Sequence, residues 1–186
     1  MHQFTDEVIA FRVQKGDAES FGVLVERYEA KLLRYGRKFL SNGADVEDLV
    51  QEVFIKSYVN IKSFDPGLKF SPWIYRIAHN VFVNAVRSKV RMPVFSFDLD
   101  LIFPQPIAPE TADEEAHRAH TRKMLDECLD KIDPKYRETL VLYFYEDMSY
   151  KEIAEVLQIP VSTVGVRIAR GKTVLKNILK DHDGII

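Results

Sequence analysis

The stretch MSYKEIAEVLQIPVSTVGVRIARGKTVL, residues 148–175, decides the fold of the C-terminal part of the chain. Ser149 and Glu152 have the spacing of a capping box, which starts a short helix. The pattern is interrupted at Gln158–Val161, and a second helix is expected from about Ser162. Its buried face should hold Val164, Ile168, Leu175 and either Ile178 or Leu179. This arrangement is the helix-turn-helix pattern, whose second helix enters the DNA major groove.

The second of these helices is also strongly basic. No acidic residue occurs from Val156 to Lys180, while that stretch contains Arg167, Arg170, Lys172, Lys176 and Lys180. A helix in the major groove lies between two phosphate walls and needs cations on its flanks. The outward face should carry Ser162, Thr163, Val166, Arg167 and Arg170. Helical hairpins in ordinary cores share this spacing, but the basic stretch favours DNA binding.

Residues 93–116 divide the chain into two parts. They contain four of its eight prolines and six acidic residues, with no lysine or arginine. Residues 1–92 carry 14 Lys+Arg against 11 Asp+Glu, and residues 117–186 carry 12 against 11, so the net charge of −2 comes from the middle. Such a composition predicts a flexible linker. No convincing strand pattern flanks it. We expect an all-α protein of two small helical domains, 1–92 and 117–186, joined by this acidic, proline-containing linker.

Helical periodicity predicts the elements of both domains. In the first, Ala18 to Phe39 forms a helix pair or one long helix, and a second helix spans about Ala44 to Ile61. A third begins with Ser71 as N-cap and Pro72 as its first residue and runs to about Ser88. Its inner face should hold Phe70, Ile74, Ile77, Ala78, Val81 and Ala85. In the second domain, helices are expected over His117–Ile132 and, after an Asp133 cap, over Lys135–Tyr145.

The third helix carries side chains that suit single-stranded nucleic acid on the opposite face. At spacings of three or four residues it has an aromatic ring, amides and arginines: Trp73, Arg76, Asn80, Asn84 and Arg87. A base can stack on the ring, the amides can bond to its edge, and the arginines can neutralise phosphate. Taken alone, the helix fits equally well with Trp73 packed in the core and the arginines solvated.

Several functional classes find no support in the sequence. The 46% hydrophobic and 29% charged residues are ordinary for a folded, soluble protein, and no apolar run or N-terminal signal pattern indicates membrane insertion or export. A cytoplasmic protein is expected. The single cysteine, Cys128, should be a small core residue, and His117 and His120 have no second ligand pair for zinc. We expect no catalysis, metal, cofactor or small-molecule substrate.

Three segments, in this order, resemble the bacterial sigma-70 family, specifically sigma factors of the extracytoplasmic-function (ECF) type. They are DVEDLVQEVFIKSY (45–58), FSPWIYRIAHNVFVNAVRS (70–88) and LDKIDPKYRETLVLYFYEDMSYKEIAEVLQIPVSTVGVRIARGKTVL (129–175). The resemblance implies that the first domain, sigma region 2, binds core RNA polymerase and recognises and melts the −10 element. The second, sigma region 4, would read the −35 element. The polymerase-binding motif is matched by Asp45, Asp48, Gln51 and Glu52.

The resemblance also implies the DNA contacts. Those to the −10 element would come from Phe64, Lys69, Trp73, Arg76, Asn80, Asn84 and Arg87, with Asn80 contacting a base. Those to the −35 element would come from Ser162, Thr163, Val166, Arg167, Arg170 and Lys172. The groove helix departs from the common pattern in three places. Ser162 replaces a glycine, Gly165 a basic residue and Val166 a small one, so no relative's −35 sequence can be transferred.

The partners implied are core RNA polymerase, promoter DNA and an anti-sigma factor, which is either soluble or membrane-linked. The protein would join the nucleoid with polymerase, and the linker would run toward the polymerase active-site cleft. The alternative is a helix-turn-helix transcriptional regulator with an N-terminal sensing or dimerisation domain. That alternative explains residues 117–186 but gives no role to the Trp73–Arg87 face or to the acidic linker.

Overall fold

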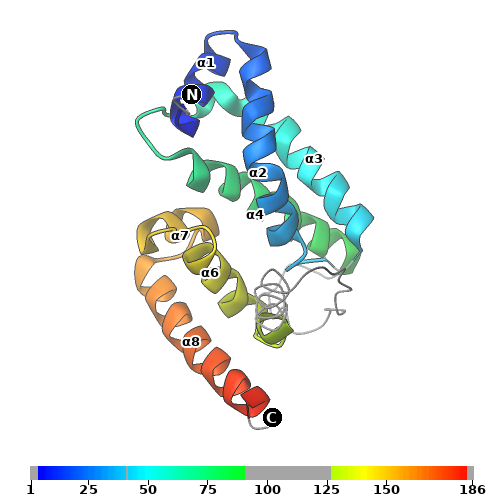
Figure 1. Ribbon diagram of the computed structural model, residues 1–186, viewed down its shortest axis with the longest axis vertical. Helices are drawn as coiled ribbons and strands as arrows, with labels where there is room; N and C mark the ends of the chain where they lie inside the picture. Colours follow the sequence, from blue (N-terminus) through cyan, green and yellow to red (C-terminus); the bar gives the residue numbers. More distant parts are fainter. Residues whose placement is uncertain (1–3, 41, 91–126, 184–186) are drawn as a thin grey trace, which may run out of the picture.

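The computed structural model describes residues 4–40, 42–90 and 127–183, and within these ranges every regular element is a helix. Figure 1 shows two groups of helices. The first comprises α1 (Asp6–Gln14), α2 (Phe21–Gly36), α3 (Gly43–Asn60) and α4 (Phe70–Val90), with 3-10 turns at Ala18–Ser20 and Ile61–Ser63. The second comprises α6 (Pro134–Phe144), α7 (Tyr150–Leu157) and α8 (Val161–Asp183), preceded by helical residues 127–130. The all-α prediction is confirmed; the expected linker lies outside the described residues.

The start of α4 differs from the sequence prediction. The helix begins at Phe70, so Ser71 is its second residue and not its N-cap. The backbone N–H of Phe70 donates to the Glu7 carboxylate of α1 at 3.0 Å. A negative side chain at a helix N-terminus satisfies an otherwise unbonded N–H and opposes the positive end of the helix dipole. The cap is therefore supplied by α1, a helix that the sequence analysis did not predict.

Aromatic packing holds the first group together. The fully buried ring of Tyr35 in α2 lies edge-to-face with Phe39, Tyr75 and Phe82, at centroid distances of 5.1, 5.1 and 5.8 Å. Edge-to-face pairs at such distances add to the stability from burial alone. Tyr75 and Phe82 widen the buried face of α4 beyond the predicted one, because α4 packs against α3 on one side and α7 on another.

The second group forms the predicted helix-turn-helix. The capping box of α7 is present: the Ser149 hydroxyl accepts from the Glu152 N–H at 3.3 Å, and the Glu152 carboxylate accepts from the Ser149 N–H at 2.7 Å. Gln158 ends the helix in the left-handed conformation, with φ of 54°. Val164 and Ile168, on the inner face of α8, are buried as predicted, and so is Cys128. Asp133 caps α6, also as predicted.

Two glycines of α2 provide a test of this packing. A Cβ added at Gly36 would lie 2.7 Å from Cζ of Phe82 and 2.8 Å from Cγ1 of Val46, whereas nothing lies within 4 Å of one added at Gly22. We expect Gly36→Ala to lower the free energy of unfolding by about 1–3 kcal/mol through overpacking. Gly22→Ala, the control, should raise it by up to about 1 kcal/mol, because alanine favours helix. Urea unfolding followed by circular dichroism measures both, and a neutral Gly36→Ala would contradict the close approach of α2 and α4.

Candidate nucleic-acid interface

The exposed face of α4 carries most of the predicted −10 residues. Arg76, Asn80, Asn84 and Arg87 are all exposed. Trp73 is half-buried, because its ring packs against Phe64 and Phe70 at centroid distances of 5.5 and 5.4 Å. Both interpretations of Trp73, as a core residue and as an exposed ring, are therefore partly correct. One part of the ring packs in the core, and another part is accessible beside the polar side chains.

The segment before α4 is held in place by contacts with other residues of the first helix group. Phe64 is only 4% exposed and supports Trp73, so its side chain is covered in this conformation. The side-chain amide of Gln14 donates to the carbonyl oxygens of Ile61 and Phe64, both at 2.7 Å. Sequence reasoning missed Gln14, since a glutamine 47 and 50 residues away gives no local signal.

The acidic residues of α3 form a second exposed surface. Asp48 and Gln51 are exposed, while Asp45 and Glu52 are partly buried. The Glu52 carboxylate pairs with Lys56 at 2.6 Å, one helical turn away. Ile55 and Val59 continue the same face and are 64% and 72% exposed. The sequence analysis missed these two, although their positions four and eight residues after Gln51 were a readable signal.

The outward face of α8 is largely as predicted. Ser162, Val166 and Arg170 are exposed, and Thr163 and Arg167 are partly so. Lys172 is exposed but lies toward a different side of the helix. Its ammonium is 4.9 Å from the ring centroid of Tyr143 and 5.1 Å from that of Phe144, within range of a cation–π interaction.

A polar contact joins the two groups of helices. The Tyr35 hydroxyl of α2 donates to the Glu138 carboxylate of α6 at 2.5 Å, and Nδ1 of His79 in α4 lies 2.7 Å from the same oxygen. Burial, together with the negative charge of Glu138, raises the pKa of Tyr35 well above its usual value. His79 and Asn80 are adjacent in sequence. The His79 side chain faces α6, whereas the Asn80 side chain, the next along α4, is exposed.

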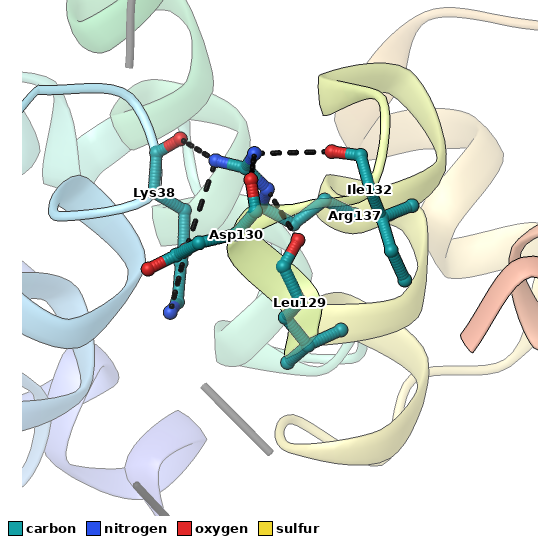
Figure 2. Close-up of polar contacts among 5 residues, drawn as sticks. All are labelled: Lys38, Leu129, Asp130, Ile132 and Arg137. Atoms are coloured by element: carbon teal, nitrogen blue, oxygen red, sulfur yellow. Dashed lines mark hydrogen bonds and ion pairs between the residues drawn. The ribbon is translucent and has the colours of Figure 1, made fainter. Parts of the chain in front are cut away.

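Arg137 forms the second part of this contact (Figure 2). Its guanidinium donates to the carbonyl oxygens of Leu129, Asp130 and Ile132 at 2.8, 2.6 and 3.0 Å. It also reaches the carbonyl oxygen of Lys38 at the end of the first group, at 3.3 Å. Burial lowers the pKa of Arg137, and the nearby carboxylates oppose that effect. This planar side chain thus fixes the start of the second group and ties it to the first.

Ion pairs extend the contact on both sides. Arg34 pairs with Glu146 at 2.8 Å, and Lys38 with Asp130 at 3.2 Å. Lys69, one of the predicted −10 residues, pairs with Glu152 of α7 at 3.0 Å. Partial burial works against the charged form of Glu152, but hydrogen bonds from Ser149 and Lys69 prevail and lower its pKa. The capping-box carboxylate of the helix-turn-helix is therefore also a contact to the other helix group.

The described residues contain neither a metal-binding cluster nor a membrane-spanning helix. Within 4–40, 42–90 and 127–183, no three His, Cys, Asp or Glu side chains gather as a metal site would require. None of the helices in these ranges combines the length and apolar character needed to cross a membrane.

Comparison with known proteins agrees with this arrangement. Residues 24–92 match Sigma-70 region 2, and residues 122–175 match Sigma-70, region 4. Over 181 residues the chain is 35% identical to the ECF RNA polymerase sigma factor SigW of Bacillus subtilis, covering 91% of this chain and 94% of that one. It is 34% identical over 182 residues to the ECF RNA polymerase sigma-E factor of Escherichia coli K12, covering 94% of both.

Solved structures agree as well. CnrH in complex with the cytosolic domain of CnrY is 28% identical, with a TM-score of 0.68 and coverage of 95% of this chain and 97% of that one. The Bartonella quintana sigma factor RpoE, solved with the anti-sigma factor NepR, has the same fold at 22% identity. Its TM-score is 0.69, with coverage of 87% and 98%. The matches to Sigma-70 region 2 and to Sigma-70, region 4 identify a transcription-initiation factor of the sigma-70 class. Within that class, the chain belongs to the ECF RNA polymerase sigma factors.

The bond between Tyr35 and Glu138 can be measured by a double-mutant cycle. Tyr35→Phe and Glu138→Ala should together destabilise the protein less than the sum of the single changes, with a coupling energy of about 1–3 kcal/mol for a buried, charge-assisted bond. Tyr28→Phe is the control, since its hydroxyl bonds to Asp6 inside the first group. Paired with Glu138→Ala, it should show no coupling in chemical denaturation. Zero coupling for Tyr35 would contradict the contact between the groups.

Proposed function

We propose that α4 recognises the −10 element as a single strand and that α8 reads the −35 element as a duplex, while α3 binds core RNA polymerase. The observation that carries this proposal is the presence of two exposed faces, on α4 and on α8, with side chains suited to nucleic acid. They differ in chemistry: the α4 face has a half-buried ring, amides and arginines, and the α8 face belongs to a helix-turn-helix. A protein that only bound duplex DNA would have no use for the first.

On α4, Asn80 is the residue proposed to contact a −10 base. Its amide offers a donor and an acceptor to a base edge, and it is exposed between Arg76 and Asn84 on the same face. Lifting a base out of the duplex costs a few kcal/mol, which stacking on Trp73 and edge contacts can offset. Lys69 and Arg87 supply charge for the phosphates. Phe64 contributes indirectly, because its buried ring supports the ring of Trp73.

On α8, the proposed −35 contacts come from Ser162, Thr163, Val166, Arg167 and Arg170, while Lys172 reaches the phosphates from the flank. On α3, the carboxylates of exposed Asp48 and partly exposed Glu52 suit a basic partner surface, and their charge favours rapid, oriented association. Ile55 and Val59 offer apolar area on the same face. We extend the proposed polymerase-binding surface, first assigned to Asp45, Asp48, Gln51 and Glu52, to these two side chains.

The two reading helices have to separate before both elements can be bound. Elements centred near −10 and −35 are about 25 base pairs apart, or roughly 85 Å of B-form DNA. A domain of about 70 residues has a radius of gyration of only roughly 11 Å, so two domains in contact cannot span that distance. We infer that the contact around Glu138 opens when the protein binds polymerase and promoter. The linker that the sequence predicts over residues 93–116, between domains 1–92 and 117–186, would permit this.

The remaining partners follow from the family. The solved relatives CnrH and RpoE are bound to CnrY and to the anti-sigma factor NepR, which supports an anti-sigma factor as a partner here. Such a factor would cover the polymerase- and DNA-binding faces and could hold the protein at the membrane. We propose a cytoplasmic protein that joins the nucleoid with polymerase, and no enzymatic activity, cofactor or small-molecule substrate.

The alternative, a regulator that acts without polymerase, predicts a different binding experiment. A dimeric helix-turn-helix repressor shifts duplex promoter DNA by itself, whereas a sigma factor of this kind should do so only with core polymerase. Transcription from a linear promoter template by core polymerase, with and without the protein, tests the proposed function directly. A shift by the protein alone, with no promoter-specific transcript, would favour the regulator.

Reversing charge on α3 should abolish binding to core polymerase. In Asp48→Arg with Glu52→Arg, two carboxylates facing the partner become cations, so attraction turns to repulsion. A pull-down with core polymerase measures the loss, and circular dichroism should show unchanged helicity. The control is Glu26→Arg with Glu29→Arg, which makes the same charge change at exposed positions of α2. Equal affinity of the α3 variant and the parent would remove this face from the interface.

Asn80→Ala should weaken open-complex formation more than closed-complex binding. The amide is needed only once a base has left the stack, so a gel shift with holoenzyme should change little. Permanganate reactivity of unpaired thymines near −10 should fall, and a pre-melted template should rescue opening but not base preference. Asn60→Ala is a matched control, because Asn60 is exposed but its amide bonds to the Lys56 carbonyl within α3. If Asn80→Ala opens promoters at the parent's rate and with its base preference, α4 is not the −10 reader.

A further inference from the structure

Val166 is an apolar side chain in the middle of the outward face of α8. It is 49% exposed, with the exposed side chains of Ser162 one turn before it and Arg170 one turn after it. The opposite face packs through Val164 and Ile168, which are 0% and 1% exposed. Among the described residues, Val166 belongs neither to the core nor to the partly buried apolar side chains packed against it.

The neighbours of Val166 leave it prominent on the helix. Gly165 has no side chain, and Ala169, one turn further along, has only a methyl group. Packing does not demand the glycine, because a Cβ there would lie 3.7 Å from the nearest atom of Tyr150, an ordinary contact distance. Small side chains around one branched one allow the helix axis to come close to a surface at that point. The two methyl groups of Val166 would then be the first atoms to touch it.

The position does not help the helix itself. Valine is a poorer helix former than alanine by up to about 0.7 kcal/mol, and at this exposure it gains little from burial. An aliphatic side chain also cannot hydrogen-bond to any base. What it can contact favourably in a major groove is the C5-methyl group of thymine, which the other three standard bases lack.

We propose that Val166 determines −35 specificity by packing against the C5-methyl group of a thymine. The proposal rests on the assignment of α8 as the −35 reader. It adds a base-specific apolar contact to the charged ones of Arg167 and Arg170. It also assigns a role to the departure of this chain from the family pattern, in which a small residue occupies the position of Val166.

The test compares thymine with deoxyuridine, which differs only by the methyl group. Promoters are first selected with holoenzyme, formed from this protein and core polymerase, out of a library randomised over the −35 element. Each −35 thymine is then replaced singly by deoxyuridine. Loss of one buried methyl group should weaken holoenzyme binding about three- to fivefold at one position, in proportion to the area removed from water. At other thymines the effect should be small.

The variants assign that effect to a side chain. With Val166→Ala, thymine and deoxyuridine should bind equally at the sensitive position, and Val166→Thr, which keeps one methyl group, should retain part of the difference. Val161→Ala is the control, because Val161 is also exposed, at 44%, but begins the helix. It should leave the methyl effect unchanged. Circular dichroism of each variant checks that α8 is intact.

Two results would overturn the proposal, and they differ in what else they remove. If Arg167→Ala and Arg170→Ala relax the −35 preference but no thymine shows a methyl effect that Val166→Ala abolishes, α8 remains the reader and Val166 is not a specificity residue. If the selected −35 element contains no thymine, Val166 is likewise not a specificity residue. If neither arginine variant changes the −35 preference, the assignment of α8 fails, and the proposal for Val166 fails with it.

Discussion

The carboxylate of Glu138 is the group on which the arrangement of the two helix groups depends. It lies between them, and one of its oxygens is within hydrogen-bond distance of both the Tyr35 hydroxyl and Nδ1 of His79. A charge in such a place is tolerated only with good partners, and removing one partner costs far more than the pair contributes. The contact is also consistent with the rotation that the buried face of α4 imposes on the helix. With His79 turned inward, the next residue, Asn80, and its neighbours Arg76 and Asn84 must face outward.

The separation that we infer for the two parts has to break this contact. Arg34, Lys38 and Lys69 each reach across to a carboxylate, and all three cations can be rehydrated when the groups move apart. The Lys69 side chain is 68% exposed, and its ion pair contributes little net stability, because water compensates well for the loss. The side chains of Glu146 and Lys38 are only 1% and 8% exposed, so breaking their pairs is more costly. Apolar side chains of both groups also belong to one continuous core, in which α4 packs against α7, and opening would expose that area to water. The interface is thus specific in geometry, and the free energy needed for the proposed opening has to come from binding to polymerase and DNA.

The sequence could predict the features that depend on neighbouring residues, but it could not predict those that depend on residues far apart in the chain. Helical periodicity, the capping box of α7 and the helix-turn-helix depend on side chains within a few residues of one another, and all are present. The expected N-cap at Ser71 was wrong, because the group that caps α4 is Glu7, 63 residues earlier in the chain. The width of the buried face of α4 could not be anticipated either, since Tyr75 and His79 are covered partly by the second helix group. The exposed positions of Ile55 and Val59 follow from the helical pattern of α3, but the sequence analysis did not include these two residues.

The buried side of α8 carries the fold, and the side to which we assign −35 specificity is the exposed one. This separation explains how the helix can depart from its family without losing its structure. Val164 and Ile168 pack against the rest of the helix-turn-helix, and they match the expected buried pattern. Gly165 and Val166 lie elsewhere on the helix, where a change of side chain alters neither the core nor the caps. Affinity for DNA comes mainly from cations that neutralise phosphates whatever the base sequence, as we propose for Lys172. We therefore expect that side chains on the outward face, such as Val166, can change without loss of structure, and that such changes alter the −35 sequence that the proposed reader prefers.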